Sequence, residues 1–483
     1  MSSGGDFEQI ERPLSRRRFL NHWANGFGGL ALAGLTSCAR PSGNPQTGDR
    51  ALAREKSKRG GRAKHVIFLY MDGGPSQIDT FDPKPRLAKE HGQPIQFDTP
   101  ATQFHIGKRV LKSPFRFAKH GECGADVSEL FPHVARHVDR LAFVRSMVSD
   151  HSEHTAANFC LHTGFGMPGR PSMGAWISYG LGLESEELPG FIVLDSGNIP
   201  LGGEDCFGAG FLPVSNQATL FRQGRAPIAD LARVEPTAEL QKSKLSLAQR
   251  LSRHHEARDG ENDQFEALIA NYEQAFRMQS AVPALVDLAD ETQATLKLYG
   301  IDQPQTAAFG RQCLLARRMV ERGVRFVQLL PPKLPDHNRW DQHSFLAEHH
   351  RNNALAVDQP IAGLLADLAT RGLLDETIVL WGGEFGRTPM AQEQAAGKDG
   401  RDHNPYGFTM WMAGGGVRGG VTYGGTDEYG YYALPGTEVH IHDLHATLLH
   451  LLGIDHTKLT YGYSGRQFRL TDVYGRVVHE IAS

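Results

Sequence analysis

Short, nearly continuous apolar runs recur along the chain and predict buried strands. The first covers residues 65–71 and stops at the turn sequence Asp72-Gly73-Gly74-Pro75. Runs this short and this apolar are typical of strands that are buried on both faces of a parallel sheet. Similar runs occupy residues 141–147, 191–194, 324–330, 377–381 and 408–412.

Segments with helical periodicity lie between these runs. They cover residues 155–163, 173–182, 306–322, 345–371 and 442–452. A further stretch, residues 236–300, is mostly helical and highly charged, and we interpret it as a helical insertion or cap. The alternation of strands and helices predicts an α/β sandwich with a central, mainly parallel sheet flanked by helices.

The N-terminal region carries the pattern of an export signal. Ser15-Arg16-Arg17-Arg18-Phe19-Leu20 is typical of a twin-arginine leader, and Leu35-Thr36-Ser37 before Cys38 is typical of a lipobox. The sequence therefore predicts a signal peptide at residues 1–38, a flexible tether at 39–63 and one domain at 64–475. We expect export to the periplasm or cell envelope, with lipid anchoring at Cys38. An ordinary signal peptide with an incidental cysteine is the alternative.

Composition and charge exclude several classes of protein. The 483 residues are 40% hydrophobic and 22% charged, the balance of a globular protein, and the formal net charge is −3. Because the basic residues concentrate before residue 64, the remaining body is acidic, which argues against nucleic acid as a partner. No apolar stretch is long enough to span a membrane, so we expect membrane contact only through the lipid anchor.

Carboxylates and imidazoles follow the predicted strands, segment after segment. They are Asp72, Asp341, His343, Glu384 and His403. Because ligands bind beyond the carboxyl ends of parallel strands, these side chains are expected at one edge of the sheet. Oxygen and nitrogen donors together indicate a divalent-metal site. The structural alternatives are a turn cap at Asp72, a salt bridge from Glu384 to Arg387, and a hydrogen bond from His403 to Asp402.

Two further histidines follow the 141–147 run. His151 and His154 are three residues apart, so they share a face if a helix begins there. They are interpreted as ligands, as substrate contacts or as a helix-cap cluster. The C-terminal histidines between 440 and 450 run into an amphipathic helix, and we expect them to be structural, with Asp443 near the N-cap.

Long motifs at four places carry a family resemblance. They are YMDGGPSQIDTFDPKP at 70–85, WGGEFGRTP at 381–389, GRDHNP at 400–405 and DLHATLLHLLGIDH at 443–456. Over residues 64–475 the chain resembles the secreted proteins known as domain of unknown function 1501. More distantly, it resembles the alkaline phosphatase and sulfatase superfamily.

The superfamily resemblance implies one or two divalent metal ions, of zinc, manganese, calcium or magnesium, at the sheet edge. Asp72 then corresponds to the first-strand ligand, and Glu384 to the aspartate that begins the usual Asp-His-Gly. Asp341 and His343 correspond to an Asp…His pair, and His403 to the later histidine. Such metals orient a phosphate or sulfate ester and activate its attacker.

The chain departs from the superfamily pattern at two positions. Phe385 replaces the histidine of Asp-His-Gly. The nucleophile usually lies nine residues before a Thr-Gly pair; here that position is His154, counted from Thr163, and Thr155 is one position away. The Cys-x-Pro/Ala-x-Arg pattern is absent at all five cysteines, which argues against a formylglycine sulfatase.

Three mechanisms follow from these departures. Thr155 attacks after a one-residue shift, His154 attacks as a covalent catalyst, or a metal-bound hydroxide attacks directly. We favour the last, with His154 and His151 holding the ester or moving protons. Arg387 is a candidate clamp for the anion, or a structural partner of Glu384.

The sequence therefore predicts an exported, metal-dependent hydrolase of phosphate or sulfate esters, acting on a small-molecule or glycan ester. The alternative is a non-catalytic relative that keeps the site for binding, as part of a cell-envelope complex. An oxidoreductase is disfavoured because no dinucleotide-binding Gly-x-Gly-x-x-Gly follows the first strand.

Overall fold

The computed structural model describes residues 61–100, 109–222, 224, 227–229, 231–259, 263–332, 334, 339–392 and 399–483. The predicted leader, Cys38 and the tether up to residue 60 lie outside the described residues. Every structural statement below refers to the described part of the chain.

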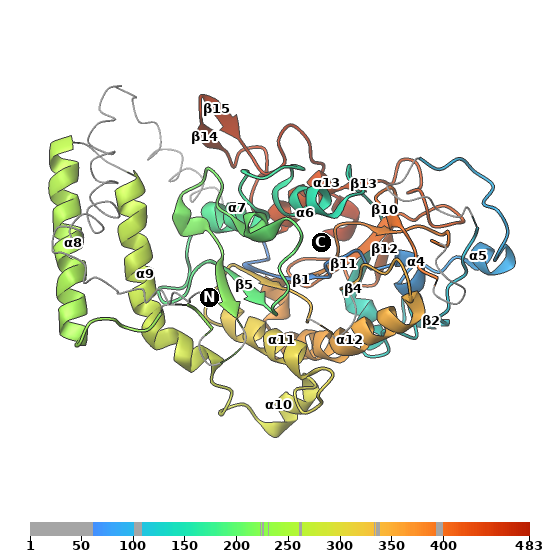
Figure 1. The fold of residues 1–483 in the computed structure, drawn as a ribbon, viewed down its shortest axis with the longest axis horizontal. Helices are drawn as coiled ribbons and strands as arrows, with labels where there is room; N and C mark the ends of the chain where they lie inside the picture. Colours follow the sequence, from blue (N-terminus) through green and yellow to red (C-terminus); the bar gives the residue numbers. More distant parts are fainter. Residues whose placement is uncertain are drawn as a thin grey trace, which may run out of the picture. The chain divides into compact units, whose positions relative to one another are not determined.

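A large sheet forms the centre of the described domain (Figure 1). Its strands follow the order β12-β4-β11-β8-β1-β7-β5-β6, with β13 paired to β4. All neighbouring strands pair in parallel except β11, which is antiparallel to both β4 and β8. The predicted mainly parallel sheet is therefore confirmed. The strands are β1 (His65–Tyr70), β4 (Leu141–Val148), β5 (Phe191–Asp195), β6 (Thr219–Arg222), β7 (Phe326–Leu329), β8 (Thr377–Gly382), β11 (Phe408–Ala413), β12 (Val421–Tyr423) and β13 (Val439–His440).

Helices cover both faces of this sheet, as predicted. Because strand side chains alternate between faces, Ile67 and Leu69 of β1 join one core cluster, while Val66 and Phe68 join the other. The first cluster is closed by α11 (Ala307–Val320) and α12 (Leu346–Thr370). The second is closed by α6 (His154–Thr163), α7 (Met173–Leu181) and α13 (Ile441–Leu451). Figure 1 shows these two sets on opposite sides of the sheet.

A pair of stacked tryptophan side chains joins β8 to the antiparallel strand β11. Trp411 of β11 lies opposite Trp381 of β8 in the antiparallel register. Their rings are stacked, with centroids 5.9 Å apart and an interplanar angle of 3°. Both side chains are almost fully buried, so this cross-strand pair stabilises the antiparallel pairing of β8 with β11.

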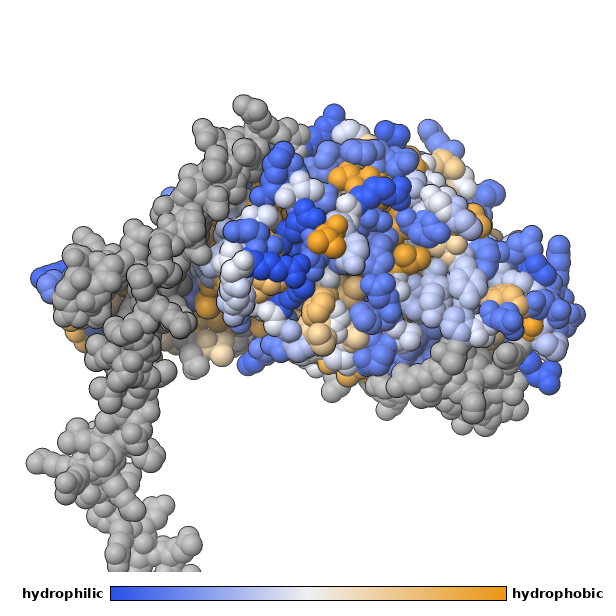
Figure 2. All heavy atoms as spheres, turned by 90° about the horizontal axis from the view of Figure 1, so that it is seen from above, coloured by the Kyte–Doolittle hydropathy of each residue, from blue (hydrophilic) through white to orange (hydrophobic). Residues whose placement is uncertain are grey.

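The remaining helices and strands lie outside the sheet. They are α4 (Gln77–Thr80), α5 (Pro85–Lys89), β2 (Phe117–His120), β3 (Ala125–Ser128), α8 (Ala238–Asp259), α9 (Asp263–Val286), α10 (Gln293–Leu298), β9 (Gly386–Arg387), β10 (His403–Asn404), β14 (Tyr461–Tyr463) and β15 (Arg466–Phe468). Among the helices of the described residues, none has both the length and the apolar character needed to cross a membrane. On the face in Figure 2, hydrophobic residues form small patches separated by hydrophilic ones.

Candidate metal centre

Four side chains from three separate segments meet beside the carboxyl end of β1. His154 is the first residue of α6, where Glu153 caps the helix by accepting from Thr155 N and Ala156 N. Asp341 and His343 lie in the connection between β7 and α12. His403 lies in β10, which pairs antiparallel with β9. One ligand atom from each of the four lies within 4.8 Å of the others. We call these four residues the His₃Asp group.

Asp341 Oδ1 is the centre of the His₃Asp group. It lies 2.8 Å from His343 Nε2, 3.2 Å from His154 Nε2 and 3.4 Å from His403 Nε2. Arg387 Nη2 is 2.7 Å away. Three imidazoles thus turn the same ring nitrogen, Nε2, toward one carboxylate oxygen.

The opposite nitrogen of each ring contacts an oxygen acceptor. His154 Nδ1 donates to Glu384 Oε1 at 2.7 Å, and His403 Nδ1 donates to the carbonyl of Ser152 at 2.6 Å. His343 Nδ1 contacts Gln392 Oε1. A carbonyl oxygen can only accept, so the proton of neutral His403 is on Nδ1 and its Nε2 carries a lone pair. This is the arrangement in which metal-binding histidines are usually held.

The charges of the group reflect its burial and its neighbours. Burial alone would lower the pKa of His154, but hydrogen bonds to Asp341 and Glu384 outweigh it and raise that pKa to about 9. Burial, with Arg387 and His154 nearby, lowers the pKa of His403 to about 4 although Asp341 opposes the shift. Burial would raise the pKa of Asp341, yet Arg387 and the three histidines hold it far below its ordinary value.

These residues fit a divalent metal. His154 Nε2 is buried and lies 3.2 Å from Asp341 Oδ1, and His343 Nε2 lies 3.0 Å from His403 Nε2. With Nδ1 protonated, the latter two nitrogens present lone pairs to each other, which a cation between them would relieve. A set of three imidazoles and one carboxylate suits zinc and other first-row transition metals better than the all-oxygen sites of calcium or magnesium.

Asp72 and Glu384 lie together next to the His₃Asp group, outside it. Both are buried, and Tyr70 Oη donates to Asp72 Oδ1 at 3.1 Å and to Glu384 Oε2 at 3.0 Å. Asp72 Oδ2 forms an ion pair with Arg339, and Glu384 also accepts from Gly73 N. Glu384 therefore supports His154, while Asp72 is neutralised by the chain's own arginine.

The pKa values of Asp72 and Glu384 are shifted in opposite directions. Burial and the charge of Glu384 raise the pKa of Asp72 to about 7, although Arg339 and His154 act in the opposite direction. Burial also disfavours the ionised form of Glu384. Hydrogen bonds from His154 and Tyr70 overcome that effect and lower the pKa of Glu384.

Arg387 pairs with Asp341, so the pairing with Glu384 considered from the sequence is not found. Its guanidinium is fully buried and donates to the carbonyls of Gly74 at 3.0 Å and Arg401 at 3.1 Å, besides the ion pair with Asp341. With these bonds to backbone carbonyls, Arg387 holds the carboxylate of Asp341 in position. A clamp on a substrate anion would have to compete with these bonds.

The remaining candidates, Thr155 and His151, lie outside the His₃Asp group. The Thr155 hydroxyl donates to Glu153 Oε1 at 3.0 Å. His151 precedes the start of α6, so the face that it was expected to share with His154 does not exist. Its ring packs so closely on Gly166 that a Cβ there would come within 2.2 Å of it.

Sequence reasoning missed three residues that organise the site. Tyr70 lies in an apolar run, and Arg339 and Gln392 lie in loops. The sequence carries no signal that distinguishes these three residues from ordinary structural residues. The C-terminal histidines are structural, as expected. His442 and His445 bond the carbonyls of Gly164 and Leu161, both at 2.8 Å.

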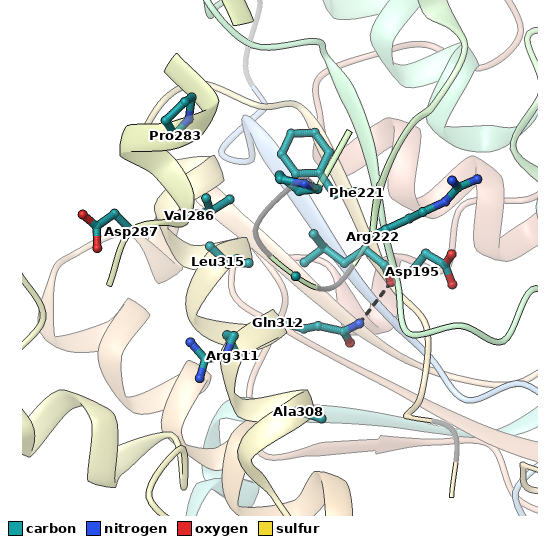
Figure 3. A pocket seen from close by; sticks show the side chains of 13 residues that line it. Asp195, Phe221, Arg222, Pro283, Val286, Asp287, Ala308, Arg311, Gln312 and Leu315 are labelled. Atoms are coloured by element: carbon teal, nitrogen blue, oxygen red, sulfur yellow. Dashed lines mark hydrogen bonds between the residues drawn. The ribbon is translucent and has the colours of Figure 1, made fainter. Parts of the chain in front are cut away.

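A separate cavity of about 540 Å³ opens between β5, β6, α9 and α11 (Figure 3). Phe221, Val286 and Leu315 form much of its apolar lining, and Gln312 Nε2 donates to the Leu194 carbonyl at 3.4 Å. No member of the His₃Asp group lines it. This cavity and the metal-ligand chemistry are therefore at different places in the described domain.

Solved structures similar to this chain include three classes of hydrolase. The PsFucS1 sulfatase from Pseudoalteromonas sp. is 13% identical, with 85% of this chain and 72% of that chain covered and a TM-score of 0.34. The alkaline phosphatase of the Antarctic bacterium TAB5 is 8% identical, with coverages of 81% and 98% and a TM-score of 0.34. The phosphonate monoester hydrolase SpPMH from Silicibacter pomeroyi is 13% identical, with coverages of 72% and 71% and a TM-score of 0.33.

A comparison with curated proteins gives no match. A family model described as "Protein of unknown function (DUF1501)" matches residues 63–482, nearly the whole described domain and all four long motifs. The chain belongs to the DUF1501 family.

Proposed function

We propose that this protein is a metal-dependent hydrolase of phosphate or sulfate esters whose metal is held by the His₃Asp group. The observation that carries the proposal is the convergence of three Nε2 atoms on Asp341 Oδ1, with Nδ1 of each ring in contact with an oxygen. In a solvated histidine cluster that binds no ligand, the three rings would not need to share this orientation.

One metal ion is proposed, and zinc fits the donor set best. A second ion beside Asp72 and Glu384 would have to displace Arg339 and the hydrogen bonds from Tyr70 and Gly73. Arg339 already supplies positive charge at that position and would compete with such an ion.

Different residues of the chain are proposed to have different roles in ester cleavage. A divalent metal bound here would polarise an ester oxygen and make a water molecule more acidic. Asp341 and His343 are the more exposed members, with 24% and 20% of their side chains accessible, so the ester approaches from their side. His154, held by Glu384, is proposed as a ligand, and Thr155 bonds Glu153. Both are therefore disfavoured as nucleophiles, and attack by water is the mechanism that remains.

The cellular setting is also part of the proposal. The twin-arginine pattern and lipobox support export and anchoring at Cys38, with one catalytic domain at about 64–475 that includes a helical insertion at 236–300. Fractionation of cells that express the chain and its Cys38→Ser variant checks the anchor. The variant should leave the membrane fraction, and retention there would contradict anchoring through Cys38.

The deciding experiment combines metal analysis with an activity screen. Purified protein should contain about one divalent metal per chain and should hydrolyse at least one aryl phosphate, phosphodiester or aryl sulfate. Asp341→Asn and His343→Ala should remove both metal and activity, whereas His151→Ala should retain both. Metal-free protein, or Asp341→Asn with full activity, would overturn the proposal.

The alternative is a non-catalytic binding protein of a cell-envelope complex. Its support is that the Thr155 hydroxyl donates to Glu153 and that Arg387 is occupied by Asp341 and backbone carbonyls. Stoichiometric metal together with no turnover of any ester class would favour this alternative over the hydrolase.

A further inference from the structure

The cavity at the carboxyl ends of β5 and β6 has the size and the position of a small-molecule site. Its volume of about 540 Å³ lies within the range of about 300–1,000 Å³ that is typical of ligand sites. Leu194 and Asp195 are the last residues of β5 and line the cavity, as do Phe221 and Arg222 at the end of β6. Because ligands of α/β proteins commonly bind beyond the carboxyl ends of parallel strands, the topology favours a binding site here.

Two helices complete the wall of this cavity. The lining residues of α11 follow the spacing of a single helical face; they are Ala308, Arg311, Gln312 and Leu315. Helix α9 contributes Pro283 and Val286. In Figure 3 these apolar side chains face the space that Phe221 borders from the strands. The interior is therefore mainly apolar.

The ionisable residues of the lining do not point into this interior. Arg222, Asp287 and Arg311 are exposed, and Figure 3 shows all three extending away from the centre of the cavity. Asp195 Oδ1 accepts from Gly197 N at 2.7 Å. A charged molecule would lose its hydration here without meeting an opposite charge inside, so the interior suits an uncharged one.

Gln312 places a hydrogen-bonding group within the apolar lining. It is only 4% exposed, and its Nε2 donates to the Leu194 carbonyl at 3.4 Å. Since a carbonyl only accepts, the amide nitrogen faces Leu194, and the other end of the amide is the acceptor Oε1. Oε1 is buried and has no hydrogen-bond partner among the described residues, which is costly for a polar atom. Because the bond to Leu194 is long and the terminal torsion of glutamine is soft, Oε1 can turn toward a donor in the cavity.

We propose that this cavity binds a small, uncharged, largely apolar molecule with one hydroxyl or N–H group, which donates to Gln312 Oε1. Contact with Phe221, Val286 and Leu315 buries the apolar body of the molecule and supplies affinity, while the donor fixes its orientation. The site is independent of ester cleavage, because no residue of the His₃Asp group lines it.

Two probes of similar shape test the proposal on the unaltered protein. They are 2-naphthol, whose hydroxyl is a donor, and 2-methoxynaphthalene, in which that donor is methylated. Isothermal titration calorimetry of the full chain should give about one site for 2-naphthol and about tenfold weaker binding of 2-methoxynaphthalene, which leaves Oε1 unpaired. Gln312→Leu should remove this preference because it lacks the acceptor. No binding of 2-naphthol, or equal affinity of the parent for both probes, would overturn the proposal.

A cavity-filling variant shows where the probes bind. Ala308→Trp places an indole in the cavity and should lower the affinity for both probes about tenfold or more. Ala307→Trp is the matched control, because both alanines are half-buried on α11 but Ala307 does not line the cavity. The control should bind like the parent, and thermal unfolding checks that both variants are folded. Unchanged binding in Ala308→Trp, or an equal loss in Ala307→Trp, would contradict binding in this cavity.

Discussion

The Nδ1 atoms of the three histidines, which face away from Asp341 Oδ1, fix the orientation of the rings in the His₃Asp group. Sequence reasoning named Asp72, Asp341, His343, Glu384 and His403 as ligands because these residues were expected at one edge of the sheet. It placed His154 among the catalytic groups, and it could not foresee Gln392 as the contact of His343. Such contacts depend on how loops far apart in sequence pack, which no local pattern encodes.

Glu384→Gln should weaken metal binding without unfolding the protein. The amide keeps the size of the carboxylate but loses the charge that His154 Nδ1–H meets at 2.7 Å, so we expect a 10–100-fold loss of metal affinity. Competition with a chromogenic chelator measures it. Gln312→Leu, a buried substitution on α11 away from the group, should retain the parent's affinity, and an unchanged affinity in Glu384→Gln would contradict a supporting role.

Thr155→Ala distinguishes the nucleophile hypotheses. The hydroxyl bonds Glu153, and that cap keeps its bonds to the backbone amides of residues 155 and 156 after the substitution. We therefore expect metal content and kcat within about twofold of the parent, a change of about 0.4 kcal/mol or less in activation free energy. Steady-state kinetics give the answer; a loss of several orders of magnitude would restore Thr155 as nucleophile.

At the scale of elements, hydrophobic periodicity located the main helices within one or two residues of their observed ends. The prediction 155–163 corresponds to α6 at 154–163, and 345–371 corresponds to α12 at 346–370. The pattern missed β6, β12 and β13, which are short and mostly half-exposed, and so lack an apolar run. It also could not give the reversed direction of β11, because a strand buried on both faces reads the same in either direction.

Helix α13 makes the domain sensitive to acid. Burial lowers the pKa of His445 to about 3, although its bond to the Leu161 carbonyl acts in the opposite direction. The unfolded chain therefore binds more protons below pH 6.5, and stability is lost as pH falls through that value. At pH 5 the loss from this residue is about 2 kcal/mol.

Chemical denaturation at pH 7.5 and pH 5 checks this linkage. His445→Gln can still donate to Leu161 but cannot be protonated, so its stability should fall less between the two pH values than that of the parent. His479→Gln, at an exposed histidine, is the control. Equal pH dependence of all three proteins would show that His445 does not contribute.

At the scale of the whole molecule, the His₃Asp group forms only when three regions that are distant in the sequence have come together. His154 follows β4, Asp341 follows β7 and His403 precedes β11, so three regions separated by some sixty to nearly two hundred residues must be in place. The sequence predicted this convergence from the general geometry of parallel sheets. What it could not predict is that Asp72 is paired with Arg339, since the pairing depends on a loop conformation.

Metal should consequently stabilise the entire domain. A ligand that binds only the folded state adds about 2.7 kcal/mol at a hundredfold excess over its Kd. Thermal unfolding with added zinc should give a Tm that rises with metal concentration and falls back with a chelator. Asp341→Asn should show no metal-dependent rise, and a rise equal to that of the parent would place the metal elsewhere.

The stacked pair of Trp381 and Trp411 gives the molecule a spectroscopic signature. Two stacked indoles whose centroids are 5.9 Å apart are close enough for their ultraviolet transitions to couple, so we expect a coupled signal in circular dichroism. The signal arises only while β8 and β11 are paired in the observed register. Because Glu384 follows β8 and His403 precedes β11, the circular dichroism of two native side chains should report on the assembly of strands next to the His₃Asp group.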